Sequence, residues 1–80
     1  MSSLRLKFGK NLRRLRLQRE FTQEHLAEAS EISVDFLSLV ERGHNAPSFE
    51  TLESLATALR ISVAELFTFH EHTGAGSGKA

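Results

Sequence analysis

Histidine is the residue type in this chain with the most direct metal-binding chemistry. The 80 residues contain four histidines and no cysteine. His70 and His72 flank Glu71 in a His-x-His pattern, while His25 and His44 lie elsewhere in the sequence. A zinc site needs three or four converging ligands. The pattern therefore favours solvated histidines, and we expect no metal and no cofactor.

Nucleophilic catalysis has no better support. A serine or threonine nucleophile needs a neighbouring base, and the sequence places no histidine or acid at a spacing that supplies one. Gly74, Gly76 and Gly78 do not form a phosphate-binding loop, because no helix follows them. We expect a protein that is not an enzyme and has no small-molecule ligand.

The basic residues are distributed very unevenly along the chain. The formal net charge is zero, yet residues 1–20 hold seven of the ten Lys and Arg side chains and one of the ten acids. A chain divided in this way can approach a polyanion with one face. The alternative is a solvated basic helix that pairs with acidic neighbours, and charge alone does not separate the two.

The elements that must position these residues are all helical. Leu4, Phe8, Leu12 and Leu15 recur at helical spacings and predict a helix over about residues 4–19. Four more helices are predicted after capping residues, with apolar faces to bury. The caps are Thr22, Ser33, Ser48 and Ser62, and the inward residues are Leu26, Ala27, Phe36, Leu37, Val40, Leu52, Leu55, Ala56 and Leu59.

The ends of these helices are also marked. Gly43 suits the position just after the third helix, and Pro47 keeps the residue before it out of a helix. Ser62 and Glu65 have the spacing of a capping box for a fifth helix through Phe67. We expect one domain over residues 1–69 and a flexible tail over 70–80. No apolar run approaches the roughly 18 residues of a membrane span, and we expect a cytoplasmic protein.

The second and third predicted helices are joined by only about residues 30–33, so they must cross steeply, as in a helix-turn-helix. Around this turn the sequence resembles the phage repressor/Cro-type (XRE) DNA-binding family over about residues 8–67. The resemblance rests on four blocks in matching order and spacing: Thr22-Gln23-Glu24-His25-Leu26-Ala27, Ile32-Ser33, Val40-Glu41-Arg42-Gly43 and Pro47-Ser48-Phe49-Glu50-Thr51-Leu52. It implies an all-α, compact five-helix, lambda-repressor-like domain that binds operator DNA, usually as a homodimer, with the third helix in the major groove.

The resemblance also implies roles for individual residues. Gln23 would contact the DNA backbone or an outer base, and Arg16 would form a partly buried, structural ion pair with Glu41. The outward positions of the third helix are Val34, Asp35, Ser38 and Leu39, and the expected phosphate contacts are Arg42, His44 and Asn45. Gln23 can alternatively be a simple helix-start residue, and Arg42 can simply offset the helix dipole.

Several positions depart from the family pattern. Val34 and Leu39 stand where relatives often have Gln or Arg, and Asp35 is an acid facing a polyanion. Apolar side chains can still contact thymine methyls, and Asp can accept from cytosine N4. Glu20 and Glu31 replace glycines that often close the first two helices, and a left-handed conformation there would cost about 1–2 kcal/mol.

The apolar residues near the C-terminus suggest a contact surface. Of Leu66, Phe67 and Phe69, one must close the core under the first helix, and the others would leave exposed apolar area of the kind that marks an interface. We expect a homodimer through the fifth helix and Phe69. A two-fold axis there would place the two third helices about 34–36 Å apart, one turn of DNA.

Two functions follow from these features. The first is a sequence-specific DNA-binding transcriptional regulator of the repressor/Cro type, with double-stranded DNA as its partner. The second is a protein-interaction module on the same scaffold, whose apolar Val34–Leu39 face would bind a toxin or anti-repressor. A positive rim around that face would favour DNA, whereas a neutral or acidic rim would favour protein.

Overall fold

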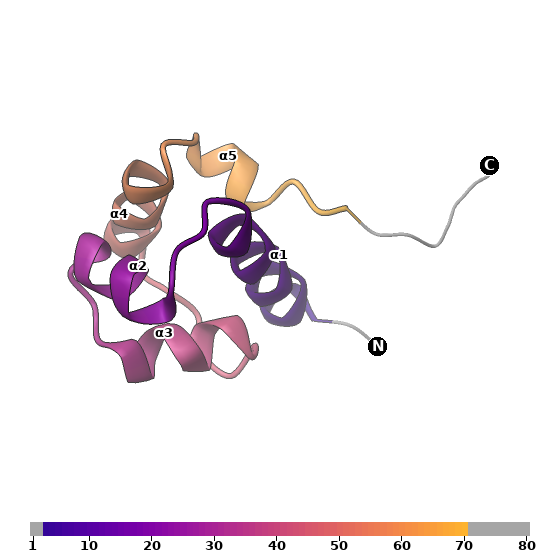
Figure 1. Ribbon diagram of the computed structural model, residues 1–80. Helices are drawn as coiled ribbons and strands as arrows, with labels where there is room; N and C mark the ends of the chain where they lie inside the picture. The colour runs from indigo at the N-terminus through magenta and orange to yellow at the C-terminus, as the bar shows by residue number, and fades with distance from the viewer. Residues whose placement is uncertain (1–2, 71–80) are drawn as a thin grey trace.

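The computed structural model describes residues 3–70, and this part of the chain is all-α (Figure 1). Its helices are α1 (Leu4–Gln18), α2 (Gln23–Ser30), α3 (Val34–Glu41), α4 (Phe49–Leu59) and α5 (Val63–Leu66). The predicted five-helix class is therefore confirmed. Of the tail expected over 70–80, all but His70 lies outside the described residues. Within residues 3–70, none of the helices combines the length and the apolar character needed to cross a bilayer.

Each helix begins where local side-chain chemistry satisfies its first backbone N–H groups. The hydroxyls of Thr22, Ser33, Ser48 and Ser62 each accept from the backbone N–H three residues on, as predicted. Ser62 and Glu65 form the reciprocal capping box. Ser3, which the sequence did not single out, caps α1 in the same way. Capping depends on residues three apart, which is why it could be predicted locally.

Left-handed residues follow four of the helices, α1 to α4. Glu20, Glu31 and Arg60 have φ near +60°, and Gly43 has φ of +81°. The sequence flagged the two glutamates and the glycine but not Arg60. After each of these four residues, a backbone N–H bonds to the carbonyl five residues earlier, as from Ile32 to Ala27. This is the Schellman arrangement, and its hydrogen bonds offset part of the conformational cost at the non-glycine positions.

The core is built mainly from leucines contributed by all five helices. Leu12, Leu26, Leu37, Leu55, Leu59 and Leu66 have no exposed surface. Leu66 thus corrects one expectation: it is the residue that closes the core, and it cannot lie on an exposed dimer interface. Leu4 corrects another, because it is 60% exposed. The first turn of α1 extends beyond the core, so its helical spacing does not lead to burial.

Close backbone packing joins α1 to α3. A Cβ on Gly9 would lie 2.5 Å from the carbonyl oxygens of Val40 and Glu41, so only glycine allows this approach. At the other side of α1, the buried Asn11 amide donates to the backbone carbonyls of Glu65 and Leu66. α1 is therefore the element that holds the end of α3 and the end of α5 in place.

Candidate nucleic-acid interface

α3 lies along one edge of the molecule, with α2 above it in the view of Figure 1. Its buried face consists of Leu37, Val40 and Glu41, and the two helices are linked by only residues 31–33. This is the steep helix-turn-helix crossing that the sequence predicted. One side of α3 therefore remains available to a partner.

The uncovered side of α3 exposes fewer side chains, and less apolar surface, than the sequence predicted. Asp35 is exposed, whereas Ser38 and Leu39 are half-buried. Val34 is also half-buried and packs against the core, so its predicted outward position is only partly correct. The start of α3 lies against the core here, and this contact covers part of the valine side chain.

The phosphate-contact residues predicted after α3 surround its C-terminal end. Arg42 and His44 are exposed, and Asn45 is half-buried. The Arg42 Nε donates to the Ser38 carbonyl at 3.4 Å, which is the helix-dipole role considered for this residue. Leu6 lies against Gly43, so the first turn of α1, with its exposed Arg5, is beside this loop.

The rim of the α3 face carries both signs of charge. Arg5 and Arg42 lie around its C-terminal end, while Glu31 and Asp35 are exposed around its N-terminal end. From the sequence, a positive rim would favour DNA binding and a neutral or acidic rim would favour protein binding. The observed rim is mixed and matches neither description. The basic end of the rim therefore favours a DNA partner, and the acidic end favours a protein partner.

A buried network fixes the position of α3 relative to α1 and α2. Arg16 donates from Nε to Glu41 Oε2 at 2.6 Å and from an Nη to Oε1 at 3.1 Å, forming an ion pair whose side chains are 8% and 2% exposed. The second Nη of Arg16 donates to the Phe21 carbonyl at 2.8 Å. This is the pair that the family resemblance implied.

Gln23 extends this network in a way that the sequence did not reveal. Its Nε2 donates to Glu41 Oε1 at 3.0 Å, so the first residue of α2 is tied to the last residue of α3. The two residues are brought together only by the crossing of the helices, and no spacing in the sequence signals the contact. Gln23 is more than the simple helix-start residue considered as an alternative.

Phe67 and Phe69 lie directly after α5. The Phe67 ring is 37% exposed and packs on Phe8, with ring centroids 5.0 Å apart. Phe69 is half-buried and meets Phe67 edge-on at 6.3 Å. Together with Val63 of α5, which is 38% exposed, these two rings form the apolar surface near α5, and Leu66 is not part of it.

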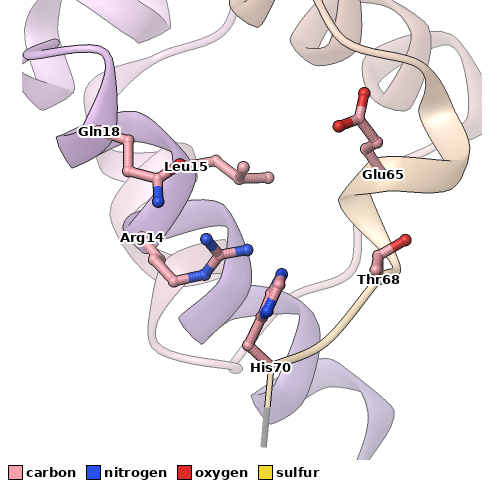
Figure 2. A pocket seen from close by; sticks show the side chains of 6 residues that line it. All are labelled: Arg14, Leu15, Gln18, Glu65, Thr68 and His70. Carbon is pink, nitrogen blue, oxygen red and sulfur yellow. The ribbon is translucent and has the colours of Figure 1, made fainter.

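A hollow of about 290 Å³ lies between α1 on one side and α5 with the segment that follows it on the other. Figure 2 shows Arg14, Leu15 and Gln18 on one side, with Glu65 and Thr68 across from them. The Arg14 guanidinium already donates to the Asn11 side chain. Separately, no three histidine, aspartate or glutamate side chains of residues 3–70 gather in a metal-binding group, and His72 lies outside these residues.

Comparisons with known proteins agree with this geometry. A protein-family profile described as Helix-turn-helix matches residues 12–66. The chain is 42% identical over 69 residues to the HTH-type transcriptional regulator DdrOP3 of Deinococcus deserti, covering 86% of this chain and 54% of that protein. It is 38% identical over 58 residues to the immunity repressor protein of Bacillus phage phi105, covering 72% of this chain and 40% of the repressor.

A solved structure matches the fold over a larger share of its own length. The restriction-modification controller protein C.AhdI from Aeromonas hydrophila superposes with a TM-score of 0.76 at 40% identity, covering 78% of this chain and 94% of that one. The chain thus spans about half of the first curated relative and nearly all of this structural neighbour.

Proposed function

The chain belongs to the helix-turn-helix family of transcription regulators, and from this premise we propose that it regulates transcription by binding operator DNA as a homodimer. The observation that carries the proposal is the α2–α3 crossing, which leaves one side of α3 uncovered at the edge of the molecule. A helix presented in this way fits the major groove. No catalytic step is assigned, and the proposed site of action is the cytoplasm.

Each part of the interface has a distinct task in this proposal. Asp35, Ser38 and Leu39 on α3 would contact base edges and supply sequence preference. Arg42, His44 and Asn45 would contact phosphates, which position the protein without selecting a sequence. The buried pair of Arg16 and Glu41 would hold α3 at the angle that both sets of contacts need.

Selection of bound sequences from a random pool of DNA duplexes tests the proposal, at about 50 and 200 mM salt. Enrichment of a two-fold symmetric motif with half-sites about 10–10.5 base pairs apart is expected. With roughly four phosphate contacts per half-site, the logarithm of affinity should fall against the logarithm of salt with a slope near −7. Retention without a motif would mean non-specific binding, and no retention at either salt would contradict DNA binding.

The protein-interaction module is the second candidate, and the acidic end of the α3 rim favours it. Glu31 and Asp35 are both exposed there and would repel phosphates. Substituting Asp35→Arg separates the candidates. A DNA-binding α3 should keep its affinity and change the selected motif, whereas a protein-binding α3 should lose its partner and gain no DNA selectivity. Glu53→Arg, on the exposed side of α4, controls for the added positive charge.

The homodimer is proposed to form through Phe67 and Phe69. The exposed Phe67 and the half-buried Phe69, which follow α5, form apolar surface of the kind that partners cover. α5 and α3 lie in different parts of the fold (Figure 1), so a dimer contact beside α5 would leave both α3 helices available to one duplex.

A further inference from the structure

The side-chain amide of Gln23 has only one orientation compatible with its neighbour. A primary amide has two N–H donors on nitrogen and a carbonyl oxygen that accepts. A carboxylate paired with a guanidinium accepts hydrogen bonds and donates none. Because the partner of Gln23 is the Glu41 carboxylate, held by Arg16, Nε2 must face Glu41. The opposite flip would set two acceptors against each other.

This orientation leaves a defined pair of groups for a partner. One N–H of Nε2 is used by Glu41, so the second N–H and Oε1 remain. Oε1 has no hydrogen-bond partner among residues 3–70. It is not buried either, because Ser30 Oγ is the one buried side-chain atom without a partner in this part of the chain. Gln23 therefore presents one acceptor and one donor to solvent, at the junction of α2 and α3.

A phosphate would use only the donor of this pair, because it offers only acceptors and gives Oε1 no partner. Among the bases, the major-groove edge of guanine offers two acceptors, cytosine a donor, and thymine an acceptor with a methyl group. Adenine alone offers a donor at N6 beside an acceptor at N7. The amide of a glutamine satisfies both atoms at once.

We propose that Gln23 recognises an adenine in the major groove, with Oε1 accepting from N6 and Nε2 donating to N7, and that Glu41 holds the amide in the required orientation. This inference rests on the proposed operator binding and adds a specificity-determining residue outside α3. It assigns Gln23 to the base contacts, so that α3 is not the sole source of sequence preference.

The test uses the full chain and the duplex recovered by selection. Each adenine of a half-site is replaced in turn by 7-deazaadenine, which pairs normally but lacks the N7 acceptor. We expect one position per half-site at which the wild-type protein loses about 10-fold in affinity. Gln23→Ala should bind the unmodified duplex more weakly and show no further loss at that position.

Two more variants make the result specific. Gln23→Lys keeps a donor for Glu41 or for a phosphate but has no acceptor, so it should lose the preference for adenine over the other three base pairs at that position. Gln18→Ala removes the other glutamine of the chain, which lines the hollow beside α5, and should retain the wild-type preference.

A phosphate contact would give a different pattern and would overturn the inference. In that case Gln23→Ala would weaken binding to all sequences alike and reduce the salt slope by about one, Gln23→Lys would restore the affinity, and no adenine would depend on Gln23. Failure of the wild-type protein to bind any duplex would instead contradict the proposed function, so the two failures are distinguishable.

Discussion

At the scale of single residues, Ser30 is a position where the protein is less stable than it could be. Its hydroxyl oxygen, at the end of α2, is buried without a hydrogen-bond partner in residues 3–70. An unpaired buried hydroxyl costs about 1–3 kcal/mol relative to one left in water. Alanine is no larger than serine, so the substitution removes the oxygen without adding volume to this buried position.

Ser30→Ala should therefore raise the free energy of unfolding by about 1 kcal/mol, which corresponds to about 4–8 °C in the melting temperature. Thermal unfolding followed by circular dichroism measures this. Ser54→Ala, at a half-buried position inside α4, shares the gain in helix propensity but removes no buried unpaired oxygen. An equal shift in the two variants would contradict the explanation.

Glu31 is the second informative residue, since it holds a left-handed conformation with φ of 61° in the turn before α3. A side chain in this region costs about 1–2 kcal/mol, and glycine avoids the cost while losing somewhat more chain entropy on folding. Glu31→Gly should raise stability by about 0.5–1 kcal/mol. Glu28→Gly, inside α2, should lower it by about 1 kcal/mol.

Urea denaturation measures both glutamate variants, with the slope of free energy against urea expected to stay constant. A gain in the free energy of unfolding for Glu31→Gly and a loss for Glu28→Gly would support backbone strain at Glu31. A loss of stability in both would mean that the turn conformation is not strained by its side chain.

At the scale of elements, the contact between α1 and α3 controls where the proposed DNA-binding face lies. Gly9 approaches the backbone carbonyls of Val40 and Glu41 so closely that a methyl group cannot fit without moving one helix. In an exposed helix, Gly→Ala is stabilising by about 0.5–1 kcal/mol. At Gly9 the atoms that the new methyl group would meet belong to the α3 backbone, which cannot move aside as a flexible side chain can. The Gly→Ala substitution should therefore lower stability here.

Gly9→Ala should destabilise the protein by about 1–3 kcal/mol and weaken operator binding beyond that loss, because α3 is displaced. Chemical denaturation and a DNA titration at a temperature where the variant is folded check the two parts. Lys10→Ala, at the adjacent exposed position of α1, should leave stability nearly unchanged. A stabilised Gly9→Ala would show that α1 and α3 are not packed backbone to backbone.

At the scale of the whole molecule, the proposed dimer interface and the proposed DNA contacts lie on different surfaces. Phe67 and Phe69 lie at the end of α5, while the α3 face lies at another edge of the fold. Phe49 offers a matched comparison, since it is 82% exposed at the start of α4. If exposed aromatic area alone drove association, Phe49 would matter most.

Phe67→Ser should shift the protein from dimer to monomer in sedimentation velocity, with at least about a 10-fold rise in the dissociation constant, because more than 1.4 kcal/mol of apolar contact is lost. Phe69→Ser should act in the same direction, and Phe49→Ser should leave the dimer unchanged. Circular dichroism must show intact helices, since Phe67 also packs on Phe8. A dimer that persists in both Phe67→Ser and Phe69→Ser would contradict this interface.

Local chemistry determined much of this protein in advance. Helix starts at Thr22, Ser33, Ser48 and Ser62, the turn at Gly43 and the family itself could be predicted because caps and apolar spacings act between residues three or four apart. Even the strained position of Glu31 was visible as an acid at a usual glycine site.

Only the tertiary structure decided which surfaces the helices share. Leu66, not its aromatic neighbours, entered the core, and Leu4 did not, because helix rotation and the reach of the core set burial. Gln23 met Glu41 across 18 positions in the chain, and Asn11 met the Leu66 carbonyl across 55. Such contacts depend on the packing of whole helices, a cooperative property that spacing along the chain does not encode.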